Sequence, residues 1–283
     1  MGSHPHPHAG AQPPAAQPLP GVQNIVAIGS GKGGVGKTTI AVNLAVALSR
    51  MGHKVGLLDA DVYGPNVPLM MGTNAQPHVG AENRIEPLEQ FGVRMISVGL
   101  LNPGDQPVIW RGPMLHSLVR QFLQQVVWGE LEYLIVDLPP GTGDVAISLI
   151  QTVPLTGAVV VTTPSDVSLQ DARKAVGMFR QLKVDILGIV ENMSYFVCPH
   201  CKHEIDVFST GGGERTARQF GLSFLGKVEL DPDIRRAGDT GKPAVLAGED
   251  SPHARSLYHF ARQVVERVAA TNAESPGSVV QIR

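Results

Sequence analysis

Apolar positions divide most of this chain into short and long segments. From residue 24 onward, short β-rich apolar runs alternate with stretches of helical periodicity, a pattern typical of βαβ units. The short runs predict strands over 25–28, 54–58, 94–98, 133–136, 158–161, 186–190 and 224–228. The longer stretches predict helices over 38–51, 113–128, 144–152, 167–182, 212–220, 231–240 and 253–270. The pattern therefore predicts an α/β fold with a mostly parallel central sheet flanked by helices.

Three segments lack this alternation. Residues 1–23 are rich in Pro, Ala, Gln and His without apolar periodicity, so we expect a disordered leader, to which no function is assigned. Residues 62–94 combine Pro and Gly turn-formers with little periodicity and predict a surface insertion after the second strand. Residues 271–283 predict a flexible tail. A single domain over 24–270 remains.

Charge and composition narrow the classes of partner. The formal net charge is -2 and the sequence pI is near 6.5. The chain therefore lacks the net positive charge that would attract it to nucleic acid or to an anionic membrane. No run approaches the roughly 18 apolar residues of a membrane span, and the N-terminus lacks the regions of a secretory signal. We therefore expect a cytoplasmic protein without a nucleic-acid or membrane partner.

A glycine-rich segment follows the first predicted strand. Residues 29–39 read GSGKGGVGKTT and match G-x-x-x-x-G-K-[ST] in the strand, loop and helix setting that this phosphate-binding motif requires. The loop N–H groups and the helix N-terminus face the phosphates, Lys37 reaches the β and γ phosphates, and Thr38 can ligate Mg²⁺. The motif predicts that ATP and Mg²⁺ bind at Gly31, Lys32, Gly33, Gly34, Val35, Gly36, Lys37, Thr38 and Thr39.

Aspartates follow two of the predicted strands. The second strand leads into Asp59 and Asp61, and the fourth leads into Asp137. A carboxylate fixed at the end of a buried strand is what a Walker B arrangement needs near Mg²⁺, so Asp137 is assigned to Mg²⁺, usually through water. Asp144 is instead predicted to be the N-cap of the helix that follows it.

The loop carries a lysine that an ordinary Walker A motif lacks. Residues 31–38, GKGGVGKT, resemble the deviant Walker A motif of the family that contains nitrogenase iron protein, ParA and MinD. The resemblance implies a three-layer P-loop NTPase fold and a nucleotide-sandwich homodimer, in which Lys32 reaches across to the partner's phosphates and stabilises charge there, as an arginine finger does.

The same resemblance assigns roles outside the loop. It implies that Asp61 orients or deprotonates the attacking water and that Asp59 assists near the metal. It also places Asn192 at the purine edge of the nucleotide, with the loop over 229–233, including Pro232, packed on the same ring. For Asn192, a buried amide that satisfies a local turn is the alternative.

The two cysteines of the chain stand close together as Cys198-Pro-His-Cys201, a spacing that suggests a metal or a redox pair. Two thiolates do not close a tetrahedral site, so either His200 or His203 completes a zinc site or a second subunit supplies two more thiolates. With four cysteines across a two-fold axis, a [4Fe-4S] cluster can be held at an exposed dimer interface. A dithiol redox pair is a further alternative, although no thioredoxin-like helix N-terminus is evident around it.

Several motifs resemble the Mrp/ApbC family of iron–sulfur cluster carrier ATPases, in family order. They are DADVYGPN at 59–66, WRGPM at 110–114, DLPPGTGD at 137–144, the segment around the cysteine pair, and FSTGGG at 208–213. The resemblance implies an ATP-hydrolysing homodimer that binds a [4Fe-4S] cluster through Cys198 and Cys201 and transfers it to apoproteins. A positioning ATPase like MinD or ParA and a structural zinc-binding ATPase are the alternatives. The former would need a basic amphipathic C-terminal helix, and 254–270 includes Glu266 beside its arginines.

Overall fold

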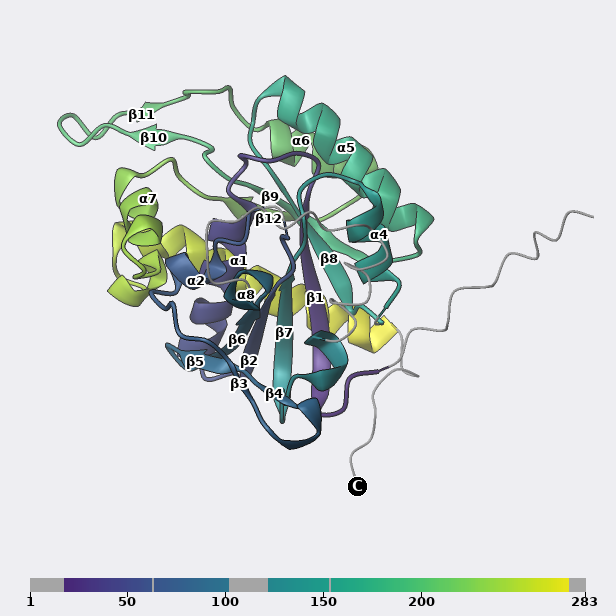
Figure 1. Ribbon diagram of the computed structural model, residues 1–283. Helices are drawn as coiled ribbons and strands as arrows, with labels where there is room; N and C mark the ends of the chain where they lie inside the picture. Colours follow the sequence, from purple (N-terminus) through teal and green to yellow (C-terminus); the bar gives the residue numbers. More distant parts are fainter. Residues whose placement is uncertain (1–17, 63, 102–121, 153, 275–283) are drawn as a thin grey trace, which may run out of the picture.

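An eight-stranded sheet forms the centre of the described molecule, in the order β12-β9-β8-β1-β7-β2-β6-β5 (Figure 1). The computed structural model describes residues 18–62, 64–101, 122–152 and 154–274. The strands are β1 (Val22–Ser30), β2 (Val55–Asp59), β5 (Leu88–Gln90), β6 (Val93–Ser97), β7 (Leu131–Asp137), β8 (Gly157–Thr162), β9 (Ile186–Glu191) and β12 (Phe224–Lys227). All neighbours pair in parallel except β5 and β6. The predicted α/β fold with a mostly parallel sheet is confirmed.

Helices cover both faces of the sheet. They are α1 (Lys37–Arg50), α2 (Val67–Met70), α4 (Asp144–Ile150), α5 (Asp166–Gln181), α6 (Gly212–Phe220), α7 (Pro232–Asp239) and α8 (Pro252–Glu274), with 3-10 turns η1 (Ala81–Asn83), η2 (Val98–Leu101) and η3 (Ala244–Ala247). Successive side chains of β1 point to opposite faces of the sheet. Val26 and Ile28 pack against α1 and α8 on one face, whereas Ile25 and Ala27 pack against α4 and α5 on the other. Both faces of the central strands are therefore buried.

Two small hairpins lie outside the main sheet. One pairs β3 (His78–Val79) with β4 (Ile85–Glu86), and the other pairs β10 (Phe196–Val197) with β11 (Glu204–Ile205). The second hairpin carries the cysteine pair and extends away from the sheet, above α7 in the view of Figure 1. Neither was predicted, because two-residue strands are too short to show an alternating pattern.

The folded region is longer at both ends than the sequence predicted. Leu19 is buried, β1 already begins at Val22, and the Gly21 carbonyl accepts a 2.8 Å hydrogen bond from the Leu131 amide, so residues 18–23 are not part of a leader. At the other end α8 continues to Glu274, past the predicted end at 270. The side-chain amide of Asn272 donates to Asn24 Oδ1 at 2.9 Å, which holds the last turn of α8 against β1.

Three further predictions need correction. The N-cap of α4 is Gly143, and Asp144 is the first helical residue, where its charge faces the helix N-terminus without capping it. The helix predicted over 113–128 lies outside the described residues up to 121; residues 122–125 are helical, but Val126 leaves the helix to bridge to Ile85. The predicted surface insertion over 62–94 also reaches the core, since Val67 is fully buried within it.

In the part of the chain that the structure describes, every helix is too short or too polar to cross a membrane.

Candidate functional site

The carboxyl ends of β1, β2 and β7 meet at one edge of the sheet. In register, Asp59 of β2 lies beside Asp137 of β7, and Asp137 lies beside Ile28 of β1. The glycine-rich loop leaves β1 at this edge and enters α1 at Lys37, after Gly36 with a left-handed φ of 78°. A Cβ on Gly36 would lie 2.2 Å from the Asn192 side chain, so glycine is required there both sterically and conformationally.

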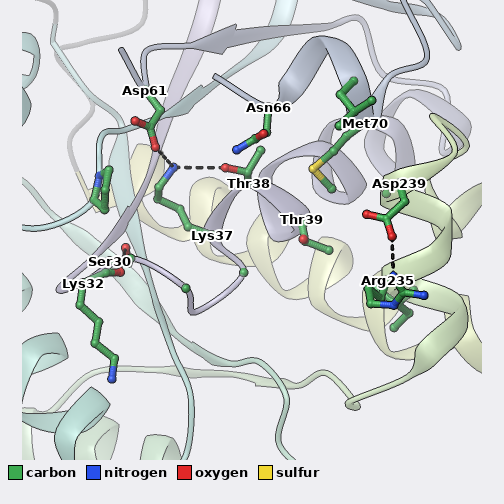
Figure 2. Close-up of a pocket in the computed structure, with 17 residues that line it drawn as sticks. Ser30, Lys32, Lys37, Thr38, Thr39, Asp61, Asn66, Met70, Arg235 and Asp239 are labelled. Carbon is green, nitrogen blue, oxygen red and sulfur yellow. Dashed lines mark hydrogen bonds and ion pairs between the residues drawn. The ribbon is translucent and has the colours of Figure 1, made fainter. Parts of the chain in front are cut away.

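A pocket of about 340 Å³ opens over this loop (Figure 2). Its lining comes from the loop, from the end of β2, from α2 and from α7, and consists of Ser30, Lys32, Gly33, Gly34, Gly36, Lys37, Thr38, Thr39, Asp61, Asn66, Leu69, Met70, Pro140, Ile234, Arg235, Gly238 and Asp239. A contribution from α7 was predicted only through Pro232, its first residue, and none was predicted from α2. Both helices approach the loop only after folding, and neither carries a phosphate-binding motif.

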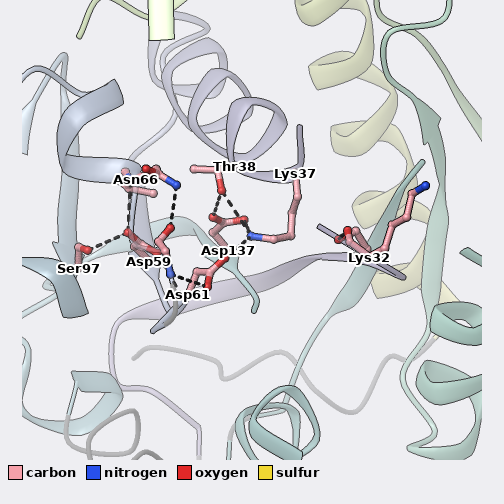
Figure 3. Close-up of polar contacts among 11 residues, drawn as sticks. Lys32, Lys37, Thr38, Asp59, Asp61, Asn66, Ser97 and Asp137 are labelled. Atoms are coloured by element: carbon pink, nitrogen blue, oxygen red, sulfur yellow. Dashed lines mark hydrogen bonds and ion pairs between the residues drawn. The ribbon is translucent and has the colours of Figure 1, made fainter. Parts of the chain in front are cut away.

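Lys37, Thr38 and Asp137 form a connected group at the base of the pocket (Figure 3). Lys37 Nζ donates to Asp137 Oδ1 at 2.6 Å, and Thr38 Oγ1 donates to Asp137 Oδ2 at 2.7 Å. Burial raises the pKa of the Asp137 carboxyl, while Lys37 and the two hydrogen bonds act in the opposite direction. The predicted loop lysine, hydroxyl and strand-end carboxylate are therefore brought together.

The two aspartates after β2 have different surroundings. Asp61 lines the pocket, with Oδ2 3.7 Å from Lys37 Nζ and Oδ1 accepting from the Gly64 amide at 3.3 Å. Asp59 is fully buried behind it and accepts hydrogen bonds from the Asp61 amide, Ser97 Oγ and the Val67 amide. Burial, with the Asp137 charge as a second cause, raises the pKa of Asp59 from 3.8 to about 7.

The oxygens of Thr38 and Asp137 fit a Mg²⁺ ion. Mg²⁺ takes hard oxygen ligands, and a hydroxyl next to a strand-end carboxylate is such a donor set. Thr38 and Asp137 would hold the ion. When bound, Mg²⁺ neutralises charge on the phosphate oxygens.

Lys32 and Asn192 lie apart from this group. The Lys32 side chain is directed away from Lys37 and Asp61 (Figures 2 and 3), and Ser30 Oγ donates to its backbone carbonyl at 2.9 Å. Asn192 is buried, and its amide donates to the Val35 carbonyl in the loop at 2.9 Å. That contact joins Asn192 to the phosphate loop, 157 positions away in the sequence. Pro232 is the first residue of α7, whose later residues line the pocket.

The cysteine pair occupies the turn between β10 and β11. Cys198 is half-buried and Cys201 is exposed, and both are free thiols. The Cys198 amide donates to the His203 carbonyl and the Lys202 amide donates to the Cys198 carbonyl, which close the turn. Hydrogen bonds from the Cys201 and His200 amides lower the pKa of the Cys198 thiol. A thiol with a lowered pKa is more readily available as a thiolate ligand.

Among the described residues, no third side chain joins the two thiols as a possible metal ligand. Neither His200 nor His203 forms a group with both thiols in which all the ligand atoms lie within 4.8 Å of one another. The hairpin of one chain thus offers two thiol ligands on an exposed turn, too few to complete a tetrahedral site.

Comparisons with known proteins place this site in context. The sequence model of a family described as "ParA: NUBPL iron-transfer P-loop NTPase" matches residues 21–265. An iron-sulfur cluster carrier protein of Deinococcus radiodurans is 52% identical over 265 residues, which cover 93% of this chain and 75% of that protein. The mouse iron-sulfur cluster transfer protein NUBPL is 45% identical over 260 residues, covering 91% of this chain and 82% of its own length.

Solved structures agree with the fold. A nucleotide-binding protein from Archaeoglobus fulgidus in complex with ADP has a TM-score of 0.71 and 37% identity, with coverage of 79% of this chain and 88% of that one. The cell division ATPase MinD of Pyrococcus furiosus has a TM-score of 0.65 at 23% identity, covering 86% of this chain and 99% of that one, a likeness of fold alone. With the phosphate loop, the strand-end aspartates and the family match together, this chain belongs to the NUBPL iron-transfer P-loop NTPase family.

Proposed function

We propose that this protein is an ATP-hydrolysing carrier that binds a [4Fe-4S] cluster between two copies of the chain and transfers it to apoproteins. The observation that carries the proposal is the exposed turn with two free thiols on a chain that also has a complete phosphate loop. Free thiols also suit a reducing compartment such as the cytoplasm.

Two cysteines from each of two subunits would supply the four thiolates that a [4Fe-4S] cluster requires. Because the turn lies at the end of a projecting hairpin, two copies can bring their turns together without rearranging either sheet (Figure 1). A cluster held at such an exposed position suits transfer better than permanent storage.

In the nucleotide reaction, the loop amides and Lys37 would hold the β and γ phosphates. Asp61, on the pocket wall, would accept a hydrogen bond from the attacking water and orient it. Water oxygen forms a bond to the γ phosphorus, the bond to the bridging oxygen breaks, and ADP and phosphate leave. Lys32 points away from Lys37 of its own chain, an orientation that suits a role at the partner's phosphates.

Anaerobic reconstitution with iron and sulfide tests the cargo. We expect about four irons and four sulfides per dimer, with broad visible charge-transfer absorption. Zinc-only occupancy without that absorption would favour a structural zinc-binding ATPase instead. ATP hydrolysis is measured on the same preparation, so the two halves of the proposal are tested separately.

A further inference from the structure

Two adjacent residues at the end of β9 contact different functional parts of the molecule. Glu191 is the last residue of β9, and Asn192 follows it. Successive side chains of an extended segment point in opposite directions, so the two diverge from one short stretch of backbone. Asn192 contacts the phosphate loop, and Glu191 contacts the segment that bears the cysteines.

On the nucleotide side the contact is close. The side-chain amide of Asn192 donates to the Val35 carbonyl. A Cβ on Gly36 would lie 2.2 Å from that side-chain nitrogen and 3.5 Å from Met193 Cε. Asn192 and Met193 therefore both lie against the part of the loop that leads into Lys37. A shift of this loop on binding phosphate would displace both side chains.

On the cysteine side, one carboxylate fixes both ends of the hairpin segment. Glu191 Oε1 accepts from Ser194 Oγ at 2.5 Å, and Oε2 accepts from the Gly213 amide at 2.5 Å. Glu191 is fully buried, so these hydrogen bonds are shielded from water, and hydrogen bonds in such surroundings are stronger. Between Ser194 and Gly213 lie β10, β11 and both cysteines. Glu191 thus ties the two ends of the segment that carries the cysteines to one point at the end of β9.

The backbone that joins the two contacts is held firmly on each side. The backbone N–H of Asn192 donates to the Thr162 carbonyl at 2.8 Å, and the backbone N–H of Ser194 donates to the Val228 carbonyl at 2.9 Å. Met193, between them, has a left-handed φ of 53°, which a residue with a side chain adopts at a cost. The segment is therefore short and constrained, and it has little freedom to absorb a displacement locally.

We propose that Glu191 is a positioning residue that couples occupation of the phosphate loop, sensed by Asn192 and Met193, to the position of the hairpin that carries Cys198 and Cys201. The inference rests on the proposed function, since it gives the nucleotide a route to the cargo thiols. Coupling of this kind is reciprocal, so whatever binds the thiols also changes nucleotide affinity by the same factor.

The test uses the thiols themselves. The chain has two cysteines, both on the hairpin, so the rate of reaction with a chromogenic disulfide reagent reports on the hairpin alone. Rates are measured on the full-length, cluster-free protein with and without Mg²⁺ and a non-hydrolysable ATP analogue. We expect the analogue to change the wild-type rate by about fivefold or more, the lower end of typical coupling between sites.

In Glu191→Gln, which keeps the side-chain size but replaces one accepting oxygen with a donor, we expect the ratio of the two rates to fall near one. Affinity for the analogue, measured by calorimetry, should remain close to wild type. Ser194→Ala removes only one of the two hairpin bonds and serves as a milder variant that should lower the ratio partially. Glu204→Gln, the same chemical change at an exposed carboxylate on β11, should leave the ratio unchanged.

A wild-type ratio of one overturns the coupling. A ratio that persists in both Glu191→Gln and Ser194→Ala also overturns it, because simple occlusion of the thiols by a partner copy would survive those changes. Since the measurement needs no cluster, it is independent of the reconstitution experiment, and failure of the proposed cargo would appear there and not here.

Discussion

Lys37 and Asp137, which stand one hundred positions apart in the sequence, form a buried ion pair with 2.6 Å between Nζ and Oδ1. The pair joins the phosphate loop to the end of β7, so the lysine that is expected to bind phosphate also neutralises the carboxylate that is expected to serve Mg²⁺. Each member therefore has a structural role besides its proposed chemical one.

Replacement of Lys37 should expose both roles. In Lys37→Ala we expect ATP turnover to fall by at least about 100-fold, as when one preorganised charge-stabilising donor is lost. We also expect the free energy of unfolding at neutral pH to fall by about 3–5 kcal/mol, because Asp137 remains as an uncompensated buried charge. Turnover assays and urea denaturation measure the two effects. Lys242→Ala, at an exposed lysine, is the control, and wild-type turnover in Lys37→Ala would refute the assignment.

Lys32 should act across the dimer. Lys32→Ala alone should lower turnover while a single subunit still binds nucleotide. Mixed with Lys37→Ala, it should regain about a quarter of wild-type turnover, because half of randomly formed dimers are mixed and each has one complete site. Steady-state ATPase assays of the separate and mixed proteins measure this. Mixtures that show only the sum of the two separate activities would rule out the role in trans.

The cysteines should bind cargo without serving the nucleotide. Cys198→Ala and Cys201→Ala should each lose reconstituted iron and its visible absorption, with nucleotide affinity nearly unchanged. His203→Ala should retain iron, since that ring does not join the two thiols as a third ligand. Full iron retention in both cysteine variants would contradict the thiolate assignment. Iron loss in His203→Ala would instead favour a metal site that His203 completes within one chain.

Asp59 should make stability depend on pH. Its pKa is raised to about 7 in the folded protein, so between about pH 4 and 7 the folded state binds a proton that the unfolded state has released. The stabilisation that this retained proton gives the folded state is therefore complete below about pH 4 and is lost as the pH rises through about 7. Relative to Asp59→Asn, the wild type should lose stability over this interval, on the order of a few kcal/mol.

Urea denaturation at several pH values measures the free energy of unfolding of the wild type and of Asp59→Asn. Asp185→Asn, at an exposed carboxylate, is the control. A wild-type curve parallel to that of Asp59→Asn across the interval would show that Asp59 does not retain its proton.

The loop glycines should differ in their tolerance of a methyl group. A Cβ on Gly31 would lie 2.0 Å from the Asp171 carbonyl oxygen, whereas one on Gly33 would meet no atom within 4 Å. We expect Gly31→Ala to lower the free energy of unfolding by about 1–3 kcal/mol, as overpacking does. Gly33→Ala should stay within about 0.5 kcal/mol of wild type. Equal effects in thermal or urea unfolding would contradict the close approach of Gly31 to α5.

Features carried by local pattern were predictable from the sequence. Strong apolar runs indicated the parallel strands, and the spacing of Gly36, Lys37 and Thr38 was enough to locate the phosphate loop. Asp137 was expected to serve Mg²⁺ near the loop, and the structure brings its carboxylate to Lys37, since the carboxyl ends of parallel strands share one edge of the sheet.

Features that depend on residues meeting after folding were missed. Glu191 follows an apolar strand as an ordinary strand-end acid does, and its partners Ser194 and Gly213 become neighbours only when the hairpin closes. Likewise, the hydrogen bonds from Ser97 and Val67 to Asp59 depend on the β2–β6 pairing and on α2, whose four residues are too short for a periodic signal.

The position of β1 in the sheet affects how the protein can be made. The phosphate loop is encoded within the first forty residues, but β1 pairs only with β7 and β8, which begin at Leu131 and Gly157. At about 5–20 residues per second of translation, roughly 5–20 s pass between synthesis of the loop and of its first strand partner. During that interval the nascent chain exposes the apolar residues of β1 and α1, which are buried in the folded protein. The nucleotide site can assemble only after β7 has been synthesised, since Asp137 stands one hundred positions after Lys37.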